Sequence, residues 1–132
     1  MTFTKEEIEN MEVSDGDEWQ YPEYGETTCN VMLYVDDFFR EKACKFFGVS
    51  YFDVCDNGWV DVYAFIDVKT EFVKTILFIV TPNNNDVCEE KELEISITNH
   101  VEAKLIYEQL MKTEGMTEFI EDCKKLLEER GE

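Results

Sequence analysis

Histidine is nearly absent from this chain, since His100 is the only one in 132 residues. A metal site built on several histidines is therefore excluded. A Cys–His catalytic pair would need His100 beside one of the thiols, and no flanking motif supports such a pair. We expect His100 to be a partly exposed residue in the first turn of a helix.

Paired cysteines are absent as well. The five cysteines are odd in number and widely spaced, and no Cys-x-x-Cys pair occurs among Cys29, Cys44, Cys55, Cys88 and Cys123. A disulfide framework or a structural zinc site is not expected from this pattern. Such thiols most often act as small apolar core residues in a reducing compartment. We therefore predict a cytoplasmic protein without metal or cofactor.

Long apolar runs are missing too. The longest run covers residues 76–80, whereas a membrane-spanning helix needs about 20 apolar residues. Residues 1–11 are charged and lack the apolar centre of a signal peptide. We expect neither a membrane segment nor a secretory leader.

Basic residues are scarce: 12 Lys and Arg stand against 31 Asp and Glu, which gives a formal net charge of -19. Contacts to phosphate depend on Lys and Arg, so we expect no direct binding to nucleic acid or to an anionic membrane. The charge instead selects a basic protein partner and speeds association with it. The same acids can also serve solubility alone.

Enzyme motifs are not found. The chain has no glycine-rich phosphate loop, no Gly-x-Ser-x-Gly elbow and no dinucleotide fingerprint. Paired carboxylates can catalyse acid–base reactions, but with so many acids their presence is not specific. We predict that the protein is not an enzyme, with a carboxylate-based enzyme as the remote alternative.

What the chain does contain is material for a core, since 44% of its residues are apolar and 14% are aromatic. That content exceeds what a disordered segment carries, despite the charge. The length fits one domain that buries roughly two-thirds of the surface of its extended chain. We predict a single α+β domain over residues 1–132.

The N-terminal part predicts a helix followed by a loop. Thr4 and Glu7 fit a capping box, and the helix that it starts ends near Met11. Residues 12–27 show no helical or alternating period and combine acids, Gly and Pro with three large aromatics. This composition predicts a long acidic loop.

A strand and a helix are predicted next. Residues 29–35 are typical of a strand, Asp36 or Asp37 can cap the following helix, and Gly48 can end it. The buried stripe of this helix is expected to consist of Phe39, Ala43, Phe46 and Phe47.

Asn57-Gly58 is the strongest hairpin signal, because both residues accept the positive φ of a tight turn. It predicts strands at about 51–56 and 59–68. The second strand would bury one face and leave an acidic, aromatic face with Trp59, Asp61, Tyr63, Phe65 and Asp67.

The same stretch partly matches a calcium loop, since Asp53, Asn57 and Gly58 fit its first, fifth and sixth positions. The third position is Cys55 and the twelfth is Ala64, so the bidentate glutamate is missing. The hairpin is the better interpretation.

Two more strands and two helices complete the prediction. Residues 71–81 form a third β-rich run, and Leu93, Ile95 and Ile97 alternate with polar residues in a fourth. A helix capped by Asn99 would end at Gly115, and Thr117 would cap the last helix, whose apolar stripe contains Phe119, Ile120, Cys123, Leu126 and Leu127. The fold expected is an antiparallel meander of four to five strands, with helices mainly on one face.

The candidate partner surface combines the acidic loop with the outer face of the hairpin strand. Aromatic residues among acids suit an anchoring role, which singles out Glu18, Trp19, Tyr21, Glu23, Tyr24, Trp59, Asp61, Tyr63 and Asp67. The alternative is that the loop folds back and its aromatics cover that face. Either way the loop is expected near the sheet.

These features predict an acidic binding protein that inhibits a basic, nucleic-acid-handling protein by placing carboxylates where phosphates would sit. In size and charge, though in no motif, the chain is similar to phage-type DNA mimics and to the acidic immunity proteins that neutralise nuclease toxins. The alternative is an acidic assembly domain that binds a protein surface unrelated to nucleic acid. The sequence leaves the oligomeric state open.

Overall fold

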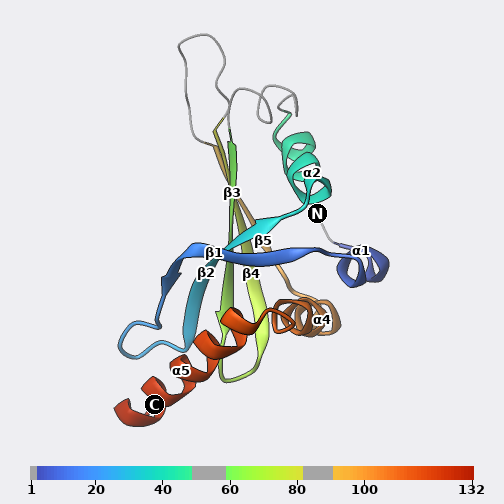
Figure 1. Ribbon diagram of the computed structural model, residues 1–132. Coiled ribbons are helices and arrows are strands. Elements are labelled where there is room, and N and C mark those ends of the chain that lie inside the picture. Colours follow the sequence, from blue (N-terminus) through green and yellow to red (C-terminus); the bar gives the residue numbers. More distant parts are fainter. Residues whose placement is uncertain (1–2, 49–58, 82–90) are drawn as a thin grey trace.

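The computed structural model describes residues 3–48, 59–81 and 91–132. Within them, five strands form one antiparallel sheet in the order β1-β2-β3-β4-β5, so that each strand pairs with the next along the chain (Figure 1). The strands are β1 (Val13–Gln20), β2 (Thr28–Val35), β3 (Trp59–Asp67), β4 (Phe72–Thr81) and β5 (Lys91–Ser96). The helices are α1 (Lys5–Glu9), α2 (Asp37–Phe47), α4 (His100–Leu110) and α5 (Glu114–Arg130). The predicted α+β meander with two C-terminal helices is confirmed.

The first two helices begin as the sequence predicts. The backbone N–H of Glu7 donates to Thr4 Oγ1 over 3.1 Å, and the Thr4 N–H donates to Glu7 Oε1 over 3.2 Å, which completes the capping box. Asp36 caps α2 by accepting from the Phe39 N–H, and Gly48 ends it at a φ of 69°. The side chains of Ala43, Phe46 and Phe47 lie outside the described residues, whereas Phe39 is buried.

The boundary between α4 and α5 differs from the prediction. Asn99 does cap α4, but the helix ends at Leu110, and α5 begins at Glu114 instead of after Thr117. Thr117 lies inside α5 and does not cap it, and its hydroxyl donates to the carbonyl oxygens of Met111 and Thr113, just before the helix. Gly115 is not a helix end either, since it is the second residue of α5, where a Cβ would collide with the carboxylate of Asp15.

Residues 13–20 form a strand, which corrects the loop predicted over 12–27. Asp15 pairs with Leu33 and Trp19 pairs with Val31, so four steps along β1 match two steps along β2. The two extra residues form a β-bulge that interrupts the alternation of a regular strand. Period-based reasoning therefore missed β1.

The core lies on one face of the sheet. Val62, Ala64 and Ile66 of β3 are at most 2% exposed, and Phe78 and Val80 of β4 are fully buried. Figure 1 shows α1, α2 and α4 together on one side of strands β3 to β5. The predicted core face of β3 is thus confirmed.

Helix α5 packs on the same face through its predicted stripe. Phe119, Ile120, Cys123 and Leu127 are buried, and Leu126 is half-buried. Cys123 is hydrogen-bonded to Cys29 of β2, and this bond together with burial raises the pKa of the Cys29 thiol. Both cysteines are buried in the core, as predicted.

His100 is exposed in the first turn of α4, and its ring stacks on Phe72 with 5.4 Å between centroids. Its predicted position is confirmed. The predicted Asn57-Gly58 hairpin and its first strand fall outside the described residues and stay predictions. In the part of the chain that the structure describes, no helix has both the length and the apolar character to cross a bilayer.

Glu71 closes the turn between β3 and β4 and ties it to both C-terminal helices. It adopts a φ of 61°, which is unusual for a residue other than glycine. Its carboxylate lies 2.8 Å from Lys124 Nζ and 2.9 Å from Lys104 Nζ. These two hydrogen bonds lower the pKa of Glu71 to about 2.

We expect Glu71→Gln to destabilise the fold by about 1 kcal/mol at pH 7, a small effect because the ion pairs are partly exposed. A lowered folded-state pKa stabilises above the unfolded value, so the contribution is lost as pH falls from 4.5 to about 2. Urea denaturation of both proteins across this pH range measures the difference. Glu9→Gln, in the exposed Lys5–Glu9 pair, is the control. A difference that persists unchanged at pH 2 would contradict the assignment.

Candidate binding surface

The bulge in β1, at the edge of the sheet, depends on a close contact at Gly16 and on a hydrogen bond from Trp19. Gly16 approaches β2 so closely that a Cβ would lie 2.7 Å from the Met32 carbonyl oxygen and 2.8 Å from its side chain. Trp19 Nε1 donates to the carbonyl oxygen of Gly16 over 2.8 Å. Only glycine fits this position, and the Trp19 hydrogen bond closes the bulge.

The bulge directs two successive carboxylates, which we call the bulge acids, toward tyrosines on the face opposite the core. The Tyr34 hydroxyl donates to Asp17 Oδ2 and the Tyr63 hydroxyl donates to Glu18 Oε2, each over 2.7 Å. The hydrogen bond to Glu18 contributes most to raising the pKa of Tyr63 to about 12, and the bond to Asp17 raises that of Tyr34. Both phenols therefore remain donors at neutral pH and hold the bulge acids in place.

Beside the bulge acids, the same face carries an apolar band with acids at its margins. Across the strands, Asp61 faces Ile79 and Ile79 faces Glu92; one step along, Tyr63 faces Leu77 and Leu77 faces Glu94. We call these six residues the outer strip. Leu77 and Ile79 are half-buried. The residues that alternate with them along β4 point to the core and are buried, namely Ile76, Phe78 and Val80.

Two further partly exposed apolar side chains, Met32 of β2 and Phe65 of β3, extend the same face beyond the outer strip. Met32 lies opposite Tyr63, and Phe65 lies opposite Thr75. Phe65 and Thr75 also line a small hollow of about 160 Å³ together with Thr28, Lys74 and Glu94.

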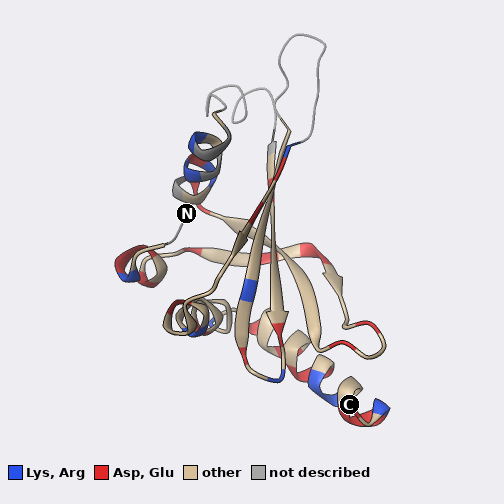
Figure 2. Cartoon of the chain, turned by 180° about the vertical axis from the view of Figure 1, so that it is seen from behind, with Lys and Arg blue, Asp and Glu red and all other residues tan. Residues whose placement is uncertain are grey.

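The acids at the margins contrast with acids elsewhere in the fold. Among the described residues, neither the bulge acids nor Glu92 and Glu94 form an ion pair, whereas Glu7 and Glu71 each contact lysine. Figure 2 shows Asp and Glu on helices and strands alike, and Lys and Arg mainly on the helices. On this face of the sheet, the bulge acids, Glu92 and Glu94 therefore have no ion-pair partner among the described residues.

The structure separates the residues predicted for the partner surface. Glu18, Asp61 and Tyr63 lie together on the outer face, as the sequence analysis supposed. Trp19 faces the core, where its ring meets Phe119 of α5 edge-on at 4.8 Å. Tyr21 packs on the same Phe119 at 4.9 Å. The alternative in which loop aromatics cover the outer face is therefore wrong for these two residues, which line up against α5 instead.

The turn between β1 and β2 is also tied to α5. The Arg130 guanidinium lies 4.8 Å from the Tyr24 ring centre and donates to the Pro22 carbonyl oxygen over 2.8 Å. Tyr24 is 80% exposed, and Glu23 is exposed in the same turn. This part of the predicted surface lies beside the C-terminal end of α5, apart from the outer strip.

Asp67 and Trp59 complete the predicted set. The Asp67 carboxylate accepts from the Thr27 hydroxyl and from the backbone N–H groups of Lys69 and Thr70. It therefore holds the end of β3 in place. Trp59 begins β3 opposite Thr81, and its side chain lies outside the described residues.

Sequence reasoning missed five contributors to this surface: Asp17, Leu77, Ile79, Glu92 and Glu94. The alternation of Glu92 and Glu94 with apolar residues was visible in the sequence. What was not visible was the register that sets them beside β4. Asp17 was hidden because the bulge was unrecognised.

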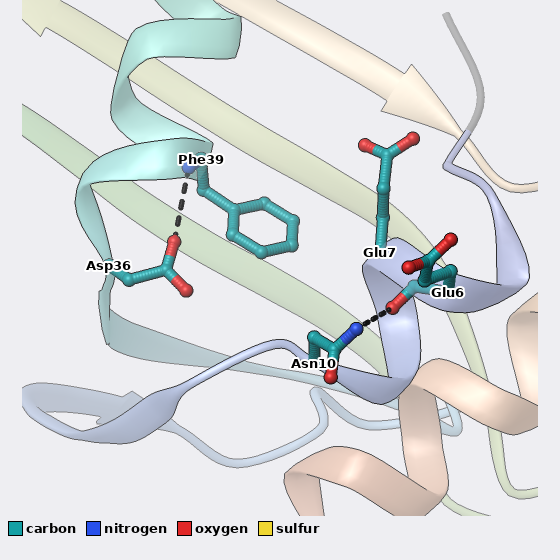
Figure 3. Close-up of a pocket in the computed structure, with 5 residues that line it drawn as sticks. All are labelled: Glu6, Glu7, Asn10, Asp36 and Phe39. Atoms are coloured by element: carbon teal, nitrogen blue, oxygen red, sulfur yellow. Dashed lines mark hydrogen bonds between the residues drawn. The ribbon is translucent and has the colours of Figure 1, made fainter.

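An acidic hollow lies between α1 and the start of α2. Figure 3 shows this pocket of about 280 Å³, with Phe39 at its side and Glu6, Glu7, Asn10 and Asp36 around it. Asp36 is engaged in capping α2 and in accepting from the Glu12 N–H. Lys42 donates to Glu7 over 2.7 Å and lowers its pKa. Two of its three carboxylates therefore already have structural partners.

In the described ranges, no group of three His, Cys, Asp or Glu side chains is arranged to hold a metal ion. Comparison of the chain with protein-family models, with curated proteins and with solved structures finds no match.

Proposed function

We propose that this chain is a non-enzymatic, acidic binding protein that engages a basic protein through the outer strip and the bulge acids. The observation that carries the proposal is the partly exposed Leu77–Ile79 centre between carboxylates on both sides. Interfaces combine an apolar centre with a polar rim, and charged rims speed association with partners of opposite sign.

Preorganisation supports the same surface. The tyrosine hydrogen bonds fix the bulge acids before a partner arrives, so less side-chain freedom is lost on binding. A close approach that only Gly16 permits maintains this arrangement. β-Bulges are frequent at sheet edges and next to functional sites, where they redirect a side chain.

The proposed partner handles nucleic acid and is inhibited by the interaction. A net charge of -19 makes the protein a competitor for a cationic groove that normally receives phosphates. A reducing, cytoplasmic setting fits this role, because Cys29 and Cys123 are buried and are present as thiols.

The test is affinity capture from the native host, followed by binding measurements with the captured protein. We expect its affinity to fall steeply with added NaCl, because screening at physiological salt acts over about 8 Å. Asp17→Asn/Glu18→Gln should weaken binding about tenfold, which corresponds to roughly 1.4 kcal/mol. DNA or RNA should compete with the protein for the partner.

The control is Glu108→Gln/Glu129→Gln, which removes the same charge from exposed positions on α4 and α5. Equal weakening by both double variants would assign the effect to net charge and contradict the surface. Binding that ignores nucleic acid would favour the assembly domain over the inhibitor.

A further inference from the structure

The outer strip has the width of one helix. Its acidic margins lie on β3 and β5, with β4 between them. Neighbouring strands are about 4.8 Å apart, so Asp61 and Glu92 are separated by roughly 10 Å across Ile79. An α-helix with its side chains is about 10–12 Å wide.

Backbone hydrogen bonding also favours a helix as the occupant. An extended segment lying on the face of a sheet would leave its own N–H and C=O groups without partners, because those of the sheet are already paired. A helix satisfies these groups internally. The core face of this sheet already shows the packing, since α4 covers β4 there.

We propose that the segment of the partner that docks on the outer strip is an amphipathic helix with an apolar stripe between two rows of Lys or Arg. Its stripe covers Leu77 and Ile79. One basic row reaches Glu92 and Glu94, and the other reaches Asp61 and the bulge acids. This inference rests on the proposed function and names what the partner presents.

Charge complementarity explains why both rows are basic. In the described structure, Glu92, Glu94 and the bulge acids form no ion pair within the chain, so their charges are available to a partner. Lys and Arg can lay their aliphatic stems along apolar surface while their charged ends reach these carboxylates. A second copy of this acidic chain would bring like charges together and is not the occupant.

The probe is a synthetic peptide of about 18 residues, or five helical turns, made of Leu and Lys with Leu at helical spacing. A second peptide of identical composition places Leu at every other position and cannot form an apolar helical stripe. Fluorescence anisotropy of labelled peptides at physiological salt measures binding, and far-UV circular dichroism measures helix formation in the complex.

We expect the helical pattern to bind at least about tenfold more tightly than the alternating one and to become helical on binding. Leu77→Thr/Ile79→Thr should weaken its binding about tenfold, since threonine keeps the strand and removes the apolar centre. Glu92→Gln/Glu94→Gln should weaken it several-fold, whereas Glu108→Gln/Glu129→Gln should change it less than about twofold.

Two failures are distinguishable. If both peptides bind equally and both strip variants weaken them, the helical occupant is wrong while the binding surface stands. If neither strip variant changes binding by more than the control does, the surface and the proposed function both fail.

Discussion

Gly16→Ala is expected to destabilise the protein by about 2–3 kcal/mol and to weaken partner binding at the same time. The new methyl group would collide with the Met32 carbonyl oxygen, which belongs to a paired strand and cannot rotate away. Overpacking of this kind typically costs about 1–3 kcal/mol. Relief by a shift of the bulge would move Asp17 and Glu18 away from Tyr34 and Tyr63. Urea denaturation and binding of the helical-pattern peptide measure the two effects.

Ser14→Ala, at an exposed position before the bulge, is the matched control and should change stability by less than about 0.5 kcal/mol. If Gly16→Ala left both the midpoint and the affinity unchanged, residues 15–19 would not form the bulge described above.

Trp19→Ala is expected to destabilise the protein by about 3 kcal/mol, because this side chain joins β1 to α5. The substitution removes an edge-on aromatic contact with Phe119 and the hydrogen bond to the Gly16 carbonyl oxygen. Truncation of buried aromatic residues typically costs about 3–5 kcal/mol, and Trp19 is only half-buried. Thermal or urea unfolding measures the loss. Trp19→Phe should lose only about 1 kcal/mol, since it keeps a ring against Phe119.

The matched comparison is Tyr24→Ala, which removes an exposed ring whose described contact is Arg130. It should cost less than about 1 kcal/mol. A Trp19→Ala protein with unchanged stability and weaker partner binding would restore the anchoring role predicted from the sequence.

Local signals in the sequence predicted most of the described sheet and the starts of α1, α2 and α4. The Thr4 capping box, the Asp36 cap and the Gly48 end depend on neighbouring residues alone, and all three are present. Alternation in residues 59–67 correctly separated core from outer positions. These features are local, so the sequence pattern contains them.

Features that depend on distant contacts were missed. The Gly115 position was interpreted as a helix end because nothing in the sequence indicates that Asp15 lies against it. Trp19 was interpreted as a surface anchor because its neighbours in sequence are acidic. Nothing in the sequence indicates that its ring contacts Phe119, about 100 residues away. Likewise, Glu92 and Glu94 join the outer strip only through the register of three strands.

The contact between β1 and α5 also sets an order of events during synthesis. Trp19 and Tyr21 leave the ribosome about 100 residues before Phe119, which corresponds to roughly 5–20 s at ordinary translation rates. Until then, the nascent hairpin has to keep two aromatic rings from other apolar surfaces without their native neighbour. The acids around them supply like-charge repulsion between nascent chains during this interval. The negative charge of the first hairpin thus opposes association between nascent chains before α5 has been synthesised.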